Sequence, residues 1–261
     1  ANFTYAKNRV DEYDEPEKKK GTYRAQTGRS LYELQGLTAE RLFTNDDFNA
    51  DGSLNAGIPS QSGVGCTNLK PGDVKYVDKN GDNAITEEDA GFIGGTIDPR
   101  MVYGFGSVIA YKNFDFNFFF QGVGDSHRII GGTPYFIPGS GTTVQGNAYS
   151  ENISDRWTTD NQDPYAFWPR FTYGPNVNNY RASTWWKKDM SFLRCKTIEL
   201  GYTLNTNWLK SLYVKSMRVY VSGNNLFAFS KFKLWDPELG TSDGLRYPMN
   251  RSIQFGVDIN F

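Results

Sequence analysis

The sequence has little histidine and cysteine, almost no net charge and no long apolar run, and each shortage excludes a class of protein. One histidine and two cysteines in 261 residues leave no Cys/His spacing for zinc. A formal net charge of −1 gives no basic field for nucleic acid. No run approaches the ~18 apolar residues of a spanning helix, but a barrel strand needs only ~9–11 alternating residues. Only helical spanning is therefore excluded.

Catalytic motifs are equally scarce. The only histidine, His127, lies in "GDSHR", which is most simply a polar loop, because a serine and a histidine adjacent in sequence seldom form a nucleophile–base pair. No phosphate-binding Gly-Lys-Ser/Thr loop occurs. We therefore expect that the chain is not an enzyme, and a secreted hydrolase is the weakest alternative.

The two cysteines leave two alternatives open. Cys66 and Cys195 are far apart in sequence, and an oxidising compartment would allow a disulfide between them. Two unpaired small side chains are the simpler interpretation.

Aromatic residues and glycine are abundant in a chain that is polar on average. Aromatics make up 16% of the residues and there are 27 glycines, while the mean hydropathy is −0.57. In residues 112–122, "KNFDFNFFFQG", phenylalanine occupies every second position from Phe114 to Phe120. Alternate side chains of a strand point to opposite faces, so this segment predicts a strand with one aromatic and one largely polar face.

The preceding residues 100–111 predict the partner strand of a hairpin. If Lys112 and Asn113 form a two-residue turn, aromatic and apolar residues face each other across the pair. The expected partners are Tyr111 with Phe114, Ile109 with Phe116, Phe105 with Phe120, Gly106 with Phe119, and Gly104 with Gln121. Glycines opposite large side chains indicate a curved wall.

Five further segments predict strands, which brings the total to about seven. Alternation is unbroken in residues 252–261, "SIQFGVDINF", and present in 217–227. In residues 192–204, Arg194 and Lys196 fall in the apolar phase, so either these charges lie beyond the apolar zone or a bulge shifts the phase near Cys195. Residues 2–8 and 29–39 are weaker candidates, and no segment shows a helical period.

Connection lengths predict a sheet with long loops at one end. Residues 39–99, 125–189 and 229–251 are long connections at the same end of the expected sheet, opposite the tight turn at Lys112. The charged connection 13–30 is the exception, since it would belong to the short-turn end. Transmembrane barrels routinely show this asymmetry, whereas compact soluble domains rarely contain such loops. The fold class is therefore all-β, a transmembrane antiparallel β-barrel represented by its last strands and long extracellular loops.

The polar face distinguishes this barrel from a soluble or surface-attached glycan-binding β-sandwich. A sandwich turns its outer face to bulk water, where Lys and Glu should dominate, but this face carries Gly, Ala, Val, Asp, Asn, Gln and Phe119. We expect the phenylalanine rings to face lipid, and Asp115, Asn117 and Gln121 to face the lumen.

One stretch, "DKNGDNAITEED", has the spacing of a calcium loop. Side-chain oxygens recur at Asp78, Asn80 and Asp82, Ala84 offers a backbone carbonyl, and Asp89 is the twelfth residue. These five residues form a tentative Ca²⁺ site of the EF-hand or dockerin type, although Asn83 replaces the usual Gly and Asp89 the usual Glu. The alternative is a surface loop held by its own side-chain hydrogen bonds.

Aromatic residues are also concentrated in the long connections. They either stack on a sugar or peptide ligand, or pack the loops together and form an interfacial girdle; for any single ring we favour packing. The residues are Trp157, Trp168, Trp185, Trp186, Trp235, Tyr135, Tyr165, Tyr173 and Tyr180.

Several motifs, in order, resemble the C-terminal third of SusC/RagA-type TonB-dependent outer-membrane transporters. They are the "DKNGD" loop leading into the aromatic hairpin, "RWTTDNQD", "STWWKKDMSFLRCKTIELGYTL", "MRVYVSGNNLFAFSKF" and the closing "QFGVDINF". Cys195, where the family has an apolar residue, and the "FNADGSLNAGIPSQSGVGCTN" loop depart from the pattern.

The resemblance implies an outer-membrane importer of oligosaccharides or peptides in a Gram-negative bacterium, energised by TonB and paired with a SusD-like lipoprotein. Residues 1–261 would be one part of its barrel, because the chain opens as if inside a strand and shows no plug. The expected partners are therefore the rest of the barrel, membrane lipid, the lipoprotein, and TonB through the absent N-terminal part.

Overall fold

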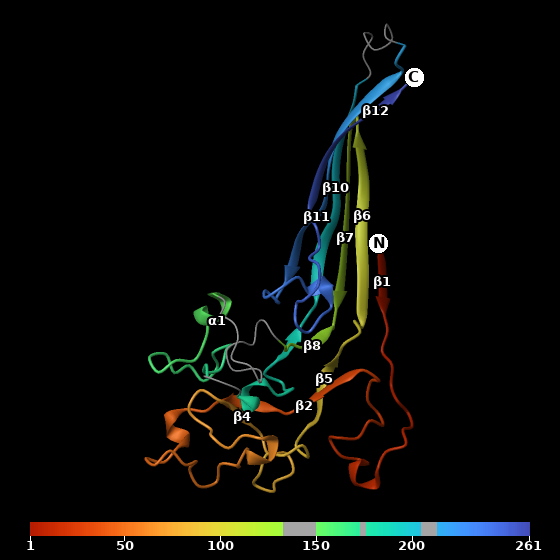
Figure 1. Cartoon of the computed structure of the whole chain (residues 1–261). Helices are drawn as coiled ribbons and strands as arrows, with labels where there is room; N and C mark the ends of the chain where they lie inside the picture. Colours follow the sequence, from red (N-terminus) through yellow and green to blue (C-terminus); the bar gives the residue numbers. More distant parts are fainter. Residues whose placement is uncertain (133–149, 173–175, 205–212) are drawn as a thin grey trace.

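The protein consists of a tall antiparallel sheet standing on a base of loops (Figure 1). The computed structural model describes residues 1–132, 150–172, 176–204 and 213–261. Six strands form the tall sheet, in the spatial order β1-β6-β7-β10-β11-β12. Their bounds are β1 Asn2–Tyr5, β6 Met101–Tyr111, β7 Phe114–Gly124, β10 Phe192–Leu204, β11 Ser216–Ser230 and β12 Ser252–Asn260.

The hairpin of β6 and β7 has the predicted register. Tyr111 pairs with Phe114, Ile109 with Phe116 and Phe105 with Phe120, while Gly106 and Gly104 face Phe119 and Gln121. Lys112 adopts the left-handed conformation, with φ of 53°, in the two-residue turn. The glycines leave room for the Phe119 ring, which would lie 3.1 Å from a Cβ at either position.

The predicted strand at 29–39 is wrong as a member of this sheet. Residues Glu33–Gly36 form β2, which pairs with β5 (Gly91–Thr96) in a separate two-stranded sheet at the base. The expected position of connection 13–30, at the short-turn end of the sheet, is also wrong. Tyr5 of β1 pairs with Met101 at the base end of β6, so the chain leaves β1 toward the base. All long connections therefore share one end of the sheet (Figure 1).

Short elements build the base, which contains two more two-stranded sheets and little helix. β3 (Ala39–Leu42) pairs with β4 (Val74–Tyr76), and β8 (His127–Ile129) pairs with β9 (Lys187–Asp189). None of the helices in the described ranges is long and apolar enough to cross a membrane. The helices are α1 Ser150–Ser154 and the 3-10 turns η1 Glu17–Lys19, η2 Asn45–Asp47, η3 Ser62–Val64, η4 Val177–Tyr180 and η5 Pro237–Leu239.

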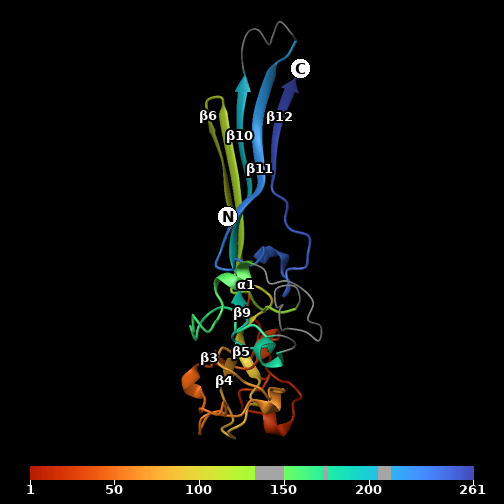
Figure 2. The ribbon, with the colours of Figure 1, turned by 60° about the vertical axis from the view of Figure 1, so that its left-hand side comes forward.

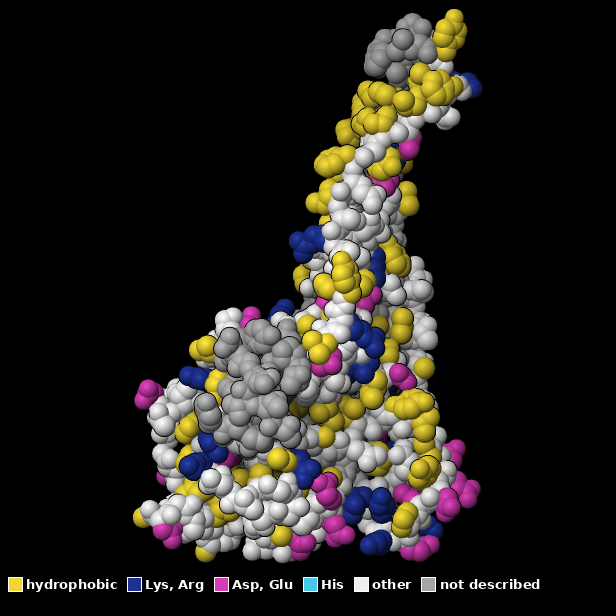
Figure 3. Space-filling model, in the orientation of Figure 1, with side chains coloured by type: hydrophobic (Ala, Val, Ile, Leu, Met, Phe, Trp, Pro, Cys, Tyr) yellow, Lys and Arg dark blue, Asp and Glu magenta, His cyan; other side chains and the backbone are white. Residues whose placement is uncertain are grey.

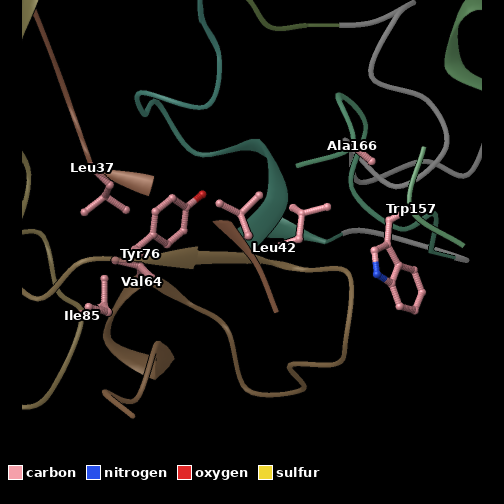
Figure 4. Close-up of a cluster of buried hydrophobic side chains, with 8 residues drawn as sticks. Leu37, Leu42, Val64, Tyr76, Ile85, Trp157 and Ala166 are labelled. Carbon is pink, nitrogen blue, oxygen red and sulfur yellow. The ribbon is translucent and has the colours of Figure 1, made fainter. Parts of the chain in front are cut away.

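The base has a hydrophobic core of its own, assembled from connections that are distant in sequence. One cluster joins residues of the 37–85 region to Trp157 and Ala166 (Figure 4). A second cluster contains Trp168, Trp186 and Phe232. Burial of these side chains makes the long loops one packed body, since each apolar side chain removed from water stabilises the arrangement by roughly 1.5–3 kcal/mol.

The tall sheet has one apolar and one polar face, as predicted. Phe255 is 83% exposed and Ile253 62% exposed on the apolar face of β12. Figure 3 shows hydrophobic side chains along the height of the sheet, with charged side chains mainly around the base. In Figure 2 the strands stand side by side above the base, and within the described residues no second sheet packs on them. A β-sandwich would bury this apolar face, so the structure favours a barrel wall.

Candidate functional site

An ionic network crosses four strands on the polar face of the tall sheet. Arg218 of β11 donates from Nε to Asp115 Oδ1 of β7 at 3.0 Å, and its Nη2 bonds the other oxygen of that carboxylate. The same Nη2 donates to Glu199 Oε1 of β10 at 2.7 Å, and Nη1 to Asp258 Oδ2 of β12 at 3.4 Å. Three carboxylates thus converge on one guanidinium, and the two bonds to Asp115 form the bidentate fork that arginine makes with a carboxylate.

Glycines make this network sterically possible. A Cβ at Gly201 would collide with both the Arg218 guanidinium and the Asp115 carboxylate. A Cβ at Gly256 would likewise collide with the ring of Tyr220, whose centroid lies 4.9 Å below the Arg218 guanidinium carbon. The polar face is therefore lined by charged and aromatic side chains lying across small residues. It suits a water-filled lumen.

The phase problem at Arg194 is resolved by the predicted β-bulge. The register of β10 against both β7 and β11 shifts between Cys195 and Thr197. Arg194 consequently pairs with Gln121, on the polar face, and is only 4% exposed. Its guanidinium bonds Asp236 and Glu238, and Lys196 also bonds Glu238. The bulge thus directs two cations to the third long connection and fastens it to the wall.

A buried polar cluster ties the first long connection to the second. The carboxylate of Asp73, which is 1% exposed, accepts from Asn176 Nδ2 and Asn179 Nδ2, each at 2.9 Å, and lies 2.8 Å from Arg170 Nε. Gln61 and Asn178 bond to each other at 2.5 Å nearby and both donate to the Val74 carbonyl. Apart from Gln61 and Val74, the two residues of each pair are more than 90 positions apart in sequence, so the sequence pattern carries no signal for these contacts.

The predicted calcium-loop residues lie together in one tight loop. Asp78 accepts from the Gly81 and Asn83 amides, both at 2.7 Å, and Asp82 accepts from the Ala84 amide at 2.9 Å. Asn83 adopts φ of 65°, the left-handed conformation that its position requires. Asn80 Nδ2 donates to Asp82 Oδ2 at 2.8 Å, and Asn80 Oδ1 accepts from the Asp82 amide at 3.0 Å. The loop is therefore held by its own side-chain hydrogen bonds, with Asn83 supplying the left-handed residue of the turn.

Asp89, the twelfth residue of the loop, is held apart from solvent. Its carboxylate accepts from the Lys79 and Thr86 amides, both at 2.8 Å, and is fully buried. For Asp78, desolvation by burial favours the neutral carboxyl, but hydrogen bonds from the Gly81 and Asn83 amides outweigh it and lower the pKa. No group of three or more His, Cys, Asp or Glu side chains in the described part of the chain is arranged to hold a metal.

Most of the loop tryptophans belong to the packing of the base. Trp168 and Trp186 are 2% and 1% exposed, with ring centroids 5.5 Å apart, and Trp157 is also buried. Tyr165 is the contrast, with 69% of its surface exposed. Tyr135 and Tyr173 lie outside the described residues.

The remaining candidate residues occupy separate positions. Cys66 and Cys195 are both free and buried, so the disulfide alternative is wrong. His127 lies on β8, where Nδ1 is 3.6 Å from Asp125. The Ser126 hydroxyl donates to the Ile97 carbonyl at 3.0 Å. Ser126 therefore has a backbone partner, and the pair lacks the nucleophile–base hydrogen bond.

Comparisons with known proteins agree on one kind of protein. No protein-family model matches the chain. The TonB-dependent receptor P26 of Formosa agariphila is 33% identical over 205 residues, which are 73% of this chain and 20% of that receptor. The TonB-dependent receptor SusC of Bacteroides thetaiotaomicron is 26% identical over 197 residues, 74% of this chain and 18% of SusC. The chain thus spans about a fifth of the curated relatives that it matches.

Solved structures show the same fold. The RagAB peptide importer in its open-open state matches with a TM-score of 0.62 and 19% identity, over 90% of this chain and 23% of that chain. A second RagAB structure, in the closed-closed state, matches with a TM-score of 0.59. The two-faced sheet, the one-sided loops and the related sequences agree: the chain belongs to the SusC/RagA-type TonB-dependent transporters, as a portion of their β-barrel.

Proposed function

We propose that the chain forms part of the wall and outer loops of an outer-membrane nutrient importer in a Gram-negative bacterium. The observation that carries this proposal is the two-faced sheet. Its apolar face remains exposed, and its opposite face holds the four-strand network around Arg218. Lipid suits the first face and a hydrated lumen the second. The part played by this chain is not catalytic.

The relatives suggest what the complete transporter carries and which proteins it works with. Those relatives include TonB-dependent receptors, SusC and the RagAB peptide importer. We infer that the complete transporter takes up an oligosaccharide or a peptide, draws energy through TonB, and works with a SusD-like surface lipoprotein. The remaining strands of the same transporter would cover the β1 and β12 edges, because an open sheet edge is not tolerated in lipid.

Two measurements test this function. The complete transporter should be recovered in the outer-membrane fraction and released by detergent. Uptake of its substrate in cells should stop when TonB is deleted and return when TonB is restored. Recovery as a soluble protein, or uptake that is independent of TonB, would contradict the proposal.

We further propose that the 78–89 loop binds Ca²⁺ as a structural ion, through Asp78, Asn80, Asp82, the Ala84 carbonyl and Asp89. Support comes from the left-handed conformation of Asn83. It also comes from Asp78, Asn80 and Asp82, whose side-chain oxygens accept in turn from the amides of Gly81, Asp82 and Ala84. A cation there would stabilise the entry to β5 and so fix the base beneath β6. Calorimetric titration of calcium into the intact protein tests it directly.

A further inference from the structure

The base contains a groove whose charged lining is entirely cationic. Two adjoining cavities, of about 380 and 560 Å³, share Lys70, Arg170 and Phe171 as lining residues, and Arg156 lines the larger one. No carboxylate in the described residues lines either cavity. Other cations of the base differ, because Arg41 and Lys75 both bond directly to the acidic side chain of Asp47.

Two of the three cations lack an acidic partner in the described part of the chain. Lys70 has an exposed side chain, and only its backbone amide bonds Asp73, at 2.9 Å. Arg156 lies with its guanidinium carbon 4.8 Å from the centroid of the Phe171 ring, which orients it without neutralising it. Both side chains are therefore available to a negatively charged ligand.

The third cation, Arg170, is fixed in place from behind. Asp73 accepts from Arg170 Nη2 at 2.9 Å and is itself buried and bonded to two asparagines. Nε and Nη2 both face Asp73, and Nη1 has no hydrogen-bond partner among the described residues, so Arg170 presents a pre-positioned donor. A donor that is already held in place loses less entropy when it binds an anion.

The neutral part of the lining suits a sugar chain. Asn45, Gln162, Thr158 and Thr159, which carry amide and hydroxyl groups, line the larger cavity together with Phe171. Sugar rings need this combination, since their hydroxyls exchange hydrogen bonds with amides while their apolar faces pack on aromatic rings. We propose that this groove binds the acidic groups, sulfate or carboxylate, of an anionic oligosaccharide. This inference rests on the proposed import function and specifies its substrate class.

The test is direct binding to the complete transporter purified in detergent. The probes are a hexamer of galacturonic acid, a sulfated dextran hexamer, a neutral dextran hexamer and a glutamate hexapeptide, each titrated calorimetrically. At least one acidic sugar should bind about tenfold more tightly than the neutral one, and its affinity should fall as salt is raised. The two acidic sugars together distinguish carboxylate from sulfate recognition.

Matched variants locate the binding. Lys70→Gln and Arg156→Gln should each lower the affinity for the acidic sugar by about tenfold. Lys18→Gln, at an exposed lysine on η1, should change nothing. Lys70 is exposed and its side chain forms no hydrogen bond or ion pair with the described residues, so its variant remains interpretable even if the Arg156 variant misfolds.

Three results would overturn the inference: equal binding of neutral and acidic sugars, equal behaviour of the Lys70 and Lys18 variants, or tighter binding of the glutamate peptide than of both sugars. Because the titration needs no TonB, the binding result does not depend on whether the transporter imports its substrate. An acidic sugar that binds without being transported would count against the import function alone.

Discussion

Arg218 on β11 reaches Asp115 on β7 across the intervening strand β10, and it passes directly over Gly201. Arg218 Nε lies 3.0 Å from Asp115 Oδ1. Asp115 and Gly201 are paired residues of adjacent strands, so the side chain of one occupies the space that the other leaves empty. The missing side chain at Gly201 is thus a structural requirement of the network.

Gly201→Ala should therefore destabilise the barrel. The added methyl group displaces the guanidinium and deprives Asp115 and Glu199 of the cation that they share, at a cost of about 1–3 kcal/mol. The urea midpoint of the complete transporter measures the effect. Gly131→Ala is the control, because no atom of the described residues lies within 4 Å of a Cβ at that position. Equal midpoints for the two variants would contradict the steric role of Gly201.

Arg194→Met should release the third long connection from the wall. Asp236 and Glu238 would lose their buried guanidinium partner, which costs about 3–5 kcal/mol when one member of such a pair is removed. We expect faster proteolysis within residues 231–251, followed by mass spectrometry. Lys196→Met removes only one bond to Glu238 and should have a smaller effect. Proteolysis at the wild-type rate in the Arg194 variant would show that other contacts hold this segment.

Asp47 should make the stability of the base pH-dependent. Burial opposes ionisation of its carboxyl, but hydrogen bonds from Arg41, the Thr44 amide and Lys75 lower its pKa to about 2, from an ordinary 3.8. Because the folded-state pKa is depressed, its contribution, about 2 kcal/mol, is complete above pH 4 and is lost as the pH falls toward 2.

The test compares Asp47→Asn with the wild type by tryptophan fluorescence during thermal unfolding of the base. The variant should unfold at a lower temperature at pH 6, and the difference should shrink toward zero at pH 2. A difference that persists unchanged at pH 2 would assign the effect to packing rather than to charge.

Calcium should raise the thermal stability of the base if the 78–89 loop holds the ion. Asp78→Asn should abolish the increase, since the first ligand of the loop loses its charge. Asp51→Asn is the matched control, because Asp51 also accepts bonds from the backbone and hydroxyl of a neighbouring residue, Ser53, in an exposed loop. Stabilisation by calcium that survives in the Asp78 variant would place the ion elsewhere.

The sequence was informative wherever structure is local. The register of β6 and β7 follows from the period of two and the two-residue turn, because together they leave one pairing that keeps the rings on one face. The bulge at Cys195 was visible as a phase conflict at Arg194. In contrast, residues 29–39 show the same local pattern as a wall strand. They lie in the base because β2 pairs with β5 and Leu37 packs in a cluster with Trp157, and periodicity does not record such distant partners.

The candidate sites also differ in whether their residues are close together in sequence. The 78–89 loop is a contiguous motif and could be identified from spacing alone. The groove with Lys70, Arg156 and Arg170 combines residues from two long connections, and none of them stands out in its own segment. Likewise, Arg218 and Asp115 are 103 residues apart, so only the strand order brings them together.

The shared core of the base constrains how such a transporter can diversify. Asp73 in the first long connection is satisfied by Arg170, Asn176 and Asn179 of the second, so neither connection has a complete interior by itself. Replacement of one connection by that of a relative would bury a carboxylate without its donors. New substrate preferences should therefore arise by exchange of these loops as a set, with paired substitutions at contacts such as Asp73 and Asn179.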